Sequence, residues 1–148
     1  MQERLLVLVV LGLALGIVAV LARKGAGRRL RRAQKTPAHE LWDGLEERPD
    51  GRPAVVAFST PSCAACHTAQ KPALAQLESR AQGAVRVFEV DAAERPEVAR
   101  RFGVLTVPTT AILDPSGRLT ALNNGFAPTS RLAEQVGLKQ TAEEGATR

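Results

Sequence analysis

The chain has few of the residues that hold metals and haem: two cysteines, two histidines and one methionine among 148 residues. Its two cysteines, Cys63 and Cys66, are separated by only two residues, so they cannot cross-link distant parts of a fold. This excludes a disulfide-stapled scaffold of the kind that small secreted domains use. The length is enough for about one domain. The chemistry of the cysteines is therefore local to one segment.

A surplus of basic over acidic residues is absent outside the N-terminal part of the chain. Eight of the 20 Lys and Arg residues lie in residues 1–36, beside a single acidic residue, Glu3. The rest of the chain has 12 basic and 14 acidic residues. Because this later part has no surplus of positive charge, we do not expect nucleic acid as a partner.

Residues 5–22 form an uninterrupted apolar run of 18 residues. As a helix the run would extend about 27 Å, which is close to the thickness of a bilayer core. A cleaved signal peptide would need a basic start and a small-x-small cleavage site. Here Glu3 offsets Arg4, and Arg23 follows the run directly. We therefore predict a single-pass anchor in the cell membrane at residues 5–22, with the lipid bilayer as a partner.

The charges on either side of this run predict its orientation. Seven basic residues follow the run within residues 23–35, and only Arg4 precedes it. Since Lys and Arg collect on cytoplasmic flanks, residues 1–4 are expected outside and residues 23–38 form a basic juxtamembrane linker. The domain that follows is then cytoplasmic, and an extracytoplasmic domain is the alternative.

Residues 39–138 alternate between short apolar runs and longer stretches with helical spacing. This pattern predicts an α/β fold in which a parallel strand pair is followed by a hairpin, giving a central mixed sheet with flanking helices. Residues 139–148 have no apolar periodicity, and we predict a disordered tail. The expected helices span residues 39–48, 64–81, 95–103 and 128–138, and the expected strands span residues 54–59, 84–90, 107–113 and 118–122.

The stretch from Cys63 to His67 fits two kinds of site, a covalently attached c-type haem and a redox-active dithiol. A haem commonly takes a second axial ligand from Met or His, and the chain offers only Met1, before the anchor, and His39. A zinc site would lack a second paired motif. These absences favour the dithiol, and we expect no metal and no cofactor.

The predicted pattern places Cys63 after a buried strand and Cys66 in the first turn of the next helix. Reaction sites of open α/β sheets gather at this edge. The positive end of the helix dipole favours a thiolate over a thiol there. We therefore assign Cys63 as the nucleophile and Cys66 as the resolving thiol.

Two stretches of the sequence, "VVAFSTPSCAAC" and "FGVLTVPTTAILDPSGRL", resemble segments of the thioredoxin superfamily over residues 39–138. The resemblance implies a thioredoxin-like fold in which Pro108 is cis and packs beside the CxxC. It also implies that Val107 offers its backbone to an extended substrate peptide, and that Gly125 lies at the rim of the substrate groove.

The sequence departs from the family pattern at several positions. Ser62 stands in place of a tryptophan, and apolar Ala57 or its neighbour Val56 stands in place of a buried acid that helps to deprotonate the resolving thiol. Ala64 and Ala65 replace the common Gly-Pro, so the redox potential cannot be transferred. His67 is a possible helper base beside Cys66, and an ordinary exposed helix residue is the alternative.

We therefore expect a membrane-tethered thiol-disulfide oxidoreductase. Its substrates would be protein disulfides, and its electrons would come from a donor such as a thioredoxin reductase or a membrane thiol relay. One alternative is an extracytoplasmic domain that relays electrons to exported proteins or apocytochromes. The other is a non-catalytic binding module with the same fold.

Overall fold

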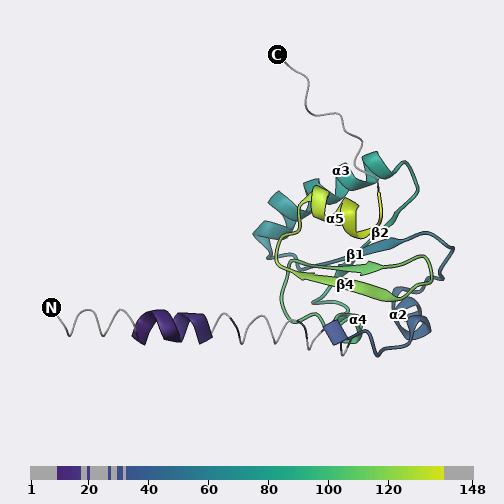
Figure 1. Ribbon diagram of the computed structural model, residues 1–148. Coiled ribbons are helices and arrows are strands. Elements are labelled where there is room, and N and C mark those ends of the chain that lie inside the picture. Colours follow the sequence, from purple (N-terminus) through teal and green to yellow (C-terminus); the bar gives the residue numbers. More distant parts are fainter. Residues whose placement is uncertain (1–9, 18–19, 21–26, 28–29, 32, 139–148) are drawn as a thin grey trace, which may run out of the picture.

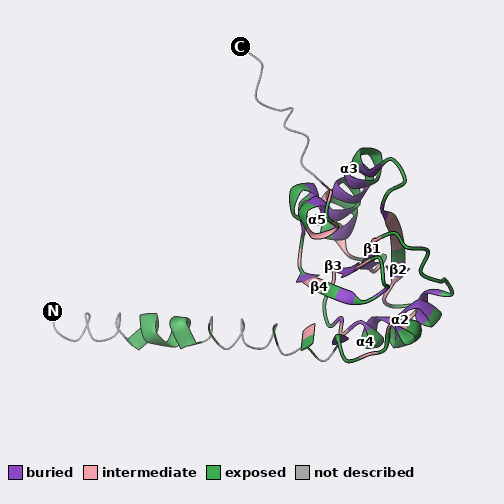
Figure 2. Cartoon of the chain, turned by 45° about the vertical axis from the view of Figure 1, so that its right-hand side comes forward, coloured by how far each residue is buried: buried purple, intermediate pink, exposed green. Residues whose placement is uncertain are grey.

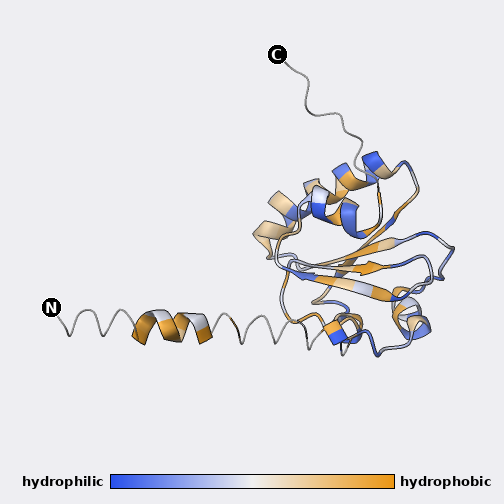
Figure 3. Ribbon diagram, viewed as in Figure 1, coloured by the Kyte–Doolittle hydropathy of each residue, from blue (hydrophilic) through white to orange (hydrophobic). Residues whose placement is uncertain are grey.

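The computed structural model describes residues 10–17, 20, 27, 30–31 and 33–138. Residues 10–17 are helical and apolar (Figure 3). The predicted anchor, residues 5–22, lies partly outside the described residues, and the predicted tail, residues 139–148, lies wholly outside them. Within the described ranges, no helix combines the length and the apolar character that crossing a bilayer requires.

A four-stranded mixed sheet forms the centre of the fold, in the order β2-β1-β3-β4 (Figure 1). Its strands are β1 (Ala54–Ser59), β2 (Arg86–Asp91), β3 (Thr109–Leu113) and β4 (Leu119–Asn124). β1 is parallel to β2 and antiparallel to β3, and β4 is antiparallel to β3. This topology confirms the predicted parallel pair followed by a hairpin. The central position of β1 also explains its continuous apolar sequence, because both of its faces are covered.

Helices cover both faces of the sheet (Figures 1 and 2). α2 (Ala38–Leu45) and α4 (Pro96–Arg101) lie on one face, and α3 (Lys71–Ala81) and α5 (Thr129–Gln135) lie on the other. Successive side chains of a strand point to opposite faces, so β1 contributes to two cores. Val56 and Phe58 join the core under α2 and α4, and Val55 and Ala57 join the core under α3 and α5.

The core under α2 and α4 contains the only tryptophan, Trp42, which is 1% exposed. Its indole N–H donates to the Gly117 carbonyl at 3.1 Å. Ala33 is also buried in this core, and Leu30 packs against it. Two residues of the predicted linker therefore pack on the domain.

The helix predicted over residues 64–81 is interrupted by a wider turn. Residues Cys66–Gln70 are π-helical, and the N–H of Lys71 donates to the carbonyl of Cys66, five residues earlier. Pro72 follows at the start of α3. Its ring lacks an N–H and clashes with the carbonyl four residues before it in a regular α-helix, which accounts for the wider turn. The kink predicted at Pro72 thus takes the form of a π-helical turn.

Candidate active site

The cysteine segment starts where β1 ends. β1 and β2 finish side by side, at the Ser59–Asp91 pair of their register. The N–H of Cys63 then donates to the Thr60 carbonyl at 3.1 Å, which closes a tight turn, and the helix begins at residue 64. Cys63 therefore stands immediately before the helix and Cys66 lies in its first turn, at the predicted edge of the sheet.

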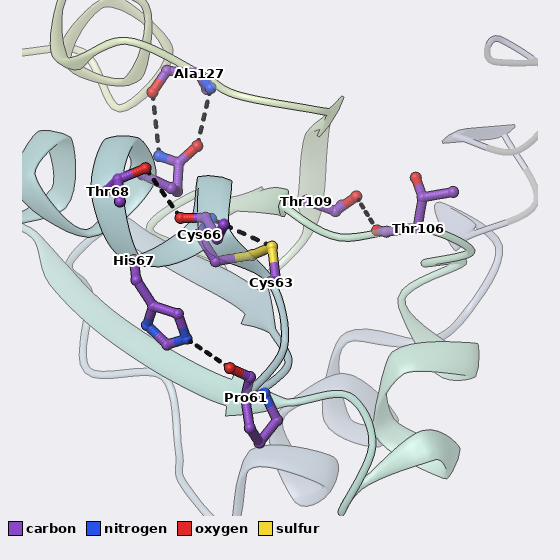
Figure 4. The surroundings of a disulfide bond; sticks show 10 residues. Pro61, Cys63, Cys66, His67, Thr68, Thr106, Thr109 and Ala127 are labelled. Atoms are coloured by element: carbon purple, nitrogen blue, oxygen red, sulfur yellow. Dashed lines mark hydrogen bonds between the residues drawn. A yellow bond between two sulfur atoms is a disulfide. The ribbon is translucent and has the colours of Figure 1, made fainter.

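Cys63 and Cys66 form a disulfide, with an S–S distance of 2.08 Å and Cα atoms 5.3 Å apart (Figure 4). The two residues differ in exposure, because Cys66 is 4% exposed whereas Cys63 is only partly buried. A substrate approaching from solvent therefore meets Cys63 first. This geometry agrees with the roles predicted for the two thiols, which remain predictions.

The backbone at the helix start is directed at the sulfur of Cys63. The N–H of Cys66 donates to Cys63 Sγ at 3.2 Å. Cys63 thus occupies the position of an N-cap residue, and its sulfur accepts a hydrogen bond from an N–H near the start of the helix. The same donor and the positive end of the helix would favour a thiolate at Cys63 once the disulfide is reduced.

The segment before β3 forms a tight turn beside the cysteine segment. The Val107–Pro108 peptide bond is cis, as the resemblance implied. The Thr109 hydroxyl donates to the Thr106 carbonyl at 2.7 Å and closes the turn around it. Val107 and Thr60 line the same cavity of about 320 Å³, so this turn lies beside the cysteine segment. Within residues 33–138, the N–H and carbonyl of Val107 make no turn or loop hydrogen bond with another backbone group.

Gly125 follows the end of β4 and is bonded to the cis turn. Its N–H donates to the Pro108 carbonyl at 2.8 Å, and its φ of +86° lies in the left-handed region that favours glycine. Two large apolar side chains are exposed next to these segments, Leu105 at 65% and Phe126 at 50%. The structure thus brings Val107, Pro108 and Gly125 together and places apolar surface on both sides.

His67 is exposed, and its ring is directed at the turn before Cys63 (Figure 4). The distance between His67 Nε2 and the Pro61 carbonyl oxygen is 3.2 Å. The ring is therefore occupied by a backbone contact in this disulfide state. Its role as a helper base stays a prediction.

A cavity of about 30 Å³ lies beside Cys66, at the position where the sequence has Ala57 instead of an acid. This volume is enough for a single water. His67, Lys71 and Glu89 also line the cavity, and Lys71 Nζ lies 3.8 Å from Glu89 Oε2. Charged groups are thus present near the buried sulfur, although they come from the helix and from β2 and not from β1.

The residues that the structure describes include no group of three or more His, Cys, Asp or Glu side chains able to hold a metal ion. The chemistry that the arrangement does support is the making and breaking of the sulfur–sulfur bond between Cys63 and Cys66. Such exchange moves two electrons without a cofactor.

Sequence reasoning did not identify two residues that shape this site, Thr109 and Gln70. Thr109 is 0% exposed and holds the cis turn, and Gln70 is 3% exposed in the π-helical turn. A signal for Gln70 exists in the sequence: it stands four residues after Cys66 and four before Leu74, on the helix face that is otherwise apolar. A polar residue there needs buried partners.

Comparison with known proteins gives consistent matches. A family model described as Thioredoxin matches residues 43–137, which include both cysteines, Pro108 and Gly125. Thioredoxin of Bacillus subtilis is 29% identical over 79 residues, which are 53% of this chain and 74% of that protein. Thioredoxin 1 of a Nostoc species is 27% identical over 84 residues, which are 57% of this chain and 77% of that protein.

Solved structures show the same arrangement of helices and strands. Mitochondrial thioredoxin 3 from Saccharomyces cerevisiae, in its oxidised form, superposes with a TM-score of 0.55 and 24% identity. The likeness covers 69% of this chain and 90% of the yeast chain. At this identity it concerns the fold alone.

Proposed function

Because the chain belongs to the thioredoxin family and is a thiol-disulfide oxidoreductase, we propose that it reduces protein disulfides at the cytoplasmic face of a membrane. The observation that carries the proposal is the disulfide-bonded pair in which Cys63 is accessible and Cys66 is buried. This difference in exposure suits a nucleophile that meets the client and a second thiol that meets only the first.

Reduction proceeds in two exchange steps. The Cys63 thiolate attacks one sulfur of the client disulfide, so a mixed disulfide forms and the other client sulfur leaves as a thiolate. The Cys66 thiolate then attacks Cys63 Sγ, which releases the second client thiol and forms the Cys63–Cys66 disulfide seen here. Two electrons pass from the protein to the client. A donor such as a thioredoxin reductase or a membrane thiol relay restores the dithiol.

The client docks as an extended strand. The N–H and carbonyl of Val107 hydrogen-bond with its backbone beside the attacked sulfur. Leu105 and Phe126 contact apolar side chains on either side of the client disulfide. Backbone pairing of this kind is independent of client sequence, so several clients are expected.

The anchor at residues 5–22 and the seven basic residues after it support attachment to the cytoplasmic face. Thiol pools keep protein thiols reduced in that compartment, so the dithiol state is maintained and the net direction is reduction. The tether then restricts clients to proteins at or near the membrane.

The activity is tested with the purified full chain, dithiothreitol as the electron donor and insulin as the protein disulfide. The expected result is turnover that Cys63→Ser abolishes. A full chain that binds insulin without reducing it would contradict the proposal and favour the non-catalytic binding module.

Attachment and orientation are tested in cells. Leu11→Arg with Leu13→Arg is expected to move the protein from the membrane fraction to the soluble fraction, because each arginine in a spanning helix costs about 3 kcal/mol. The matched control, Leu11→Ala with Leu13→Ala, should stay in the membrane. Cys63 and Cys66 are the only cysteines, so a membrane-impermeant maleimide reports directly on the domain. Labelling only after permeabilisation is expected, and labelling of intact cells would instead place the domain outside.

A further inference from the structure

Gln70 connects the helix of the active site to the segment that follows β4, where Gly125 lies at the predicted rim of the substrate groove. Its Nε2 donates to the Ala127 carbonyl at 3.1 Å, and the N–H of Ala127 donates to Gln70 Oε1 at 2.9 Å (Figure 4). Gln70 is 3% exposed and Ala127 is 0% exposed. One buried side-chain amide therefore satisfies both backbone polar groups of a single residue, 57 positions later in the chain.

The segment that Gln70 holds carries Phe126. Gly125 is bonded to Pro108 at 2.8 Å and Ala127 is bonded to Gln70, so the residue between them is fixed on both sides. Phe126 itself is 50% exposed, so a large apolar side chain is half open to solvent. Its position relative to the cysteines therefore depends on Gln70, which lies four residues after Cys66.

We propose that Gln70 is a positioning residue that holds Phe126 at the rim of the substrate groove for protein clients. This inference rests on the proposed reduction of protein disulfides. Without the amide, the N–H and carbonyl of Ala127 lose their partners in a buried site, and the segment moves to find others. Phe126 then no longer contacts an extended client while Cys63 Sγ attacks, although the thiol chemistry itself is unchanged.

The effect is expected to be local. The Thr129 hydroxyl donates to the Ala73 carbonyl at 3.0 Å, so the start of α5 keeps its own attachment to α3. Gly125 likewise keeps its bond to Pro108. Loss of Gln70 thus frees residues 126–127 and leaves the rest of the fold in place.

The test compares a protein disulfide with a small one, using the full chain and Gln70→Met, which keeps the side-chain length and removes both hydrogen bonds. With insulin, kcat/KM is expected to fall about tenfold through a higher KM. With bis(2-hydroxyethyl) disulfide, which carries no peptide segment to dock against Phe126, the rate is expected to stay within about twofold. Equal losses on both substrates, or no loss on insulin, would overturn the proposal.

A matched control removes a second amide pair from the same side of the sheet. Gln135 exchanges two hydrogen bonds with Asn123, at 2.8 and 3.0 Å, and Asn123 is held independently by the pairing of β4 with β3. Gln135→Met is therefore expected to leave the KM for insulin unchanged. An equal rise in KM in both variants would assign the effect to general loosening and overturn the proposal.

Hydrogen exchange of the Ala127 amide gives a readout that needs no activity. We expect it to accelerate at least about tenfold in Gln70→Met. Unchanged exchange overturns the role of Gln70 whatever the enzyme does. Conversely, an unaltered protein that fails to reduce insulin overturns the proposed function, while the exchange rate still decides the role of Gln70.

Discussion

The two faces of the sheet bury different kinds of side chain. Under α2 and α4, Trp42, Phe58 and Phe102 are each at most 1% exposed, and the rings of Phe58 and Phe102 pack at a tilt with centroids 5.2 Å apart. Among residues 33–138, none of those in the core under α3 and α5 is aromatic. This core is bordered instead by buried polar residues, of which Gln70 and Thr129 each bond to backbone on another segment.

This difference separates stability from activity. Large aromatic side chains contribute most to burial, so the face under α2 and α4 contributes most to the free energy of unfolding. Polar side chains with fixed partners define positions, so the face under α3 and α5 determines how the site is arranged. Substitutions on the first face should change the amount of folded protein, and those near the second should change what each folded molecule does.

The largest effect on stability is expected from Trp42→Ala. Removal of this buried side chain should lower the free energy of unfolding by about 3–5 kcal/mol, measured by urea denaturation. Insulin reduction per folded molecule should stay the same, because Trp42 packs on the face away from α3. Trp42→Phe, which loses the bond to Gly117 but keeps a ring, should lose less. A fall in the activity of each folded molecule that parallels the loss of stability would contradict the separation of stability from activity between the two faces.

On the other face of the sheet, Ala57→Asp is expected to change both stability and the resolving step. The new carboxyl would lie in the cavity beside Cys66. Ala57 is 5% exposed, so a carboxyl at this position would be buried. Burial of this group should cost about 2 kcal/mol of stability. It should also accept the proton of the resolving thiol, so the mixed disulfide at Cys63 decays several-fold faster in a stopped-flow assay. Ala57→Asn has the same shape without a proton acceptor, and equal acceleration there would contradict this explanation.

A smaller effect is expected at the β3–β4 turn, which contacts the core under α2 and α4 only through Gly117 and its flanking strand residues. Burial raises the pKa of Asp114, but hydrogen bonds from Ser116 and Arg118 outweigh it, so the pKa lies below its ordinary value. The folded state therefore favours the carboxylate. Its stabilisation is present above pH 4 or so, the pKa of an unfolded aspartate, and is lost as the pH falls through the folded pKa. Asp114→Ala should cost about 1 kcal/mol at pH 7 and progressively less in acid.

The free energy of unfolding of Asp114→Ala is measured by urea denaturation between about pH 2.5 and 7, a range that includes the ordinary aspartate pKa. Asp114→Asn serves as the control, because it keeps the turn's acceptor oxygen but cannot titrate. A difference between Asp114→Ala and the unaltered protein that stays constant down to the lowest pH would contradict the assigned role of the charge.

The smallest effect is expected at His67. Its ring contacts the Pro61 carbonyl, so His67→Ala should lower the rate of insulin reduction by less than about twofold. The measurement is the decay rate of the mixed disulfide at Cys63 in a stopped-flow assay, since a helper base beside Cys66 acts on that step. A tenfold loss confined to the resolving step would instead make His67 the helper base.

Local patterns in the sequence predicted much of the fold. The strand at Ala54–Ser59 was expected at these same residues, because a strand covered on both faces is a continuous apolar run. The place of Cys63 and Cys66 at its end followed from that strand. The pairing of Pro108 with the cysteine segment came from resemblance alone, since no local rule brings residues that far apart together.

Other features depend on contacts that the local sequence does not specify. Pro72 predicts a kink, but the sequence alone does not specify that the preceding turn, Cys66–Gln70, widens into a π-helical turn to accommodate its ring. The two hydrogen bonds between Gln70 and Ala127 join residues 57 positions apart, so no local pattern predicts them. Ala33 lies in a stretch rich in basic residues, which obscured its burial in the core.

The most direct test of the central claim, that Cys63 is the nucleophile and Cys66 the resolving thiol, is trapping on oxidised insulin. Cys66→Ser cannot complete the second exchange, so it should accumulate a mixed disulfide between Cys63 and insulin, visible by mass spectrometry and removed by dithiothreitol. Cys63→Ser, which leaves only the buried Cys66, should accumulate none. Equal trapping by both variants, or trapping by Cys63→Ser alone, would contradict the assignment.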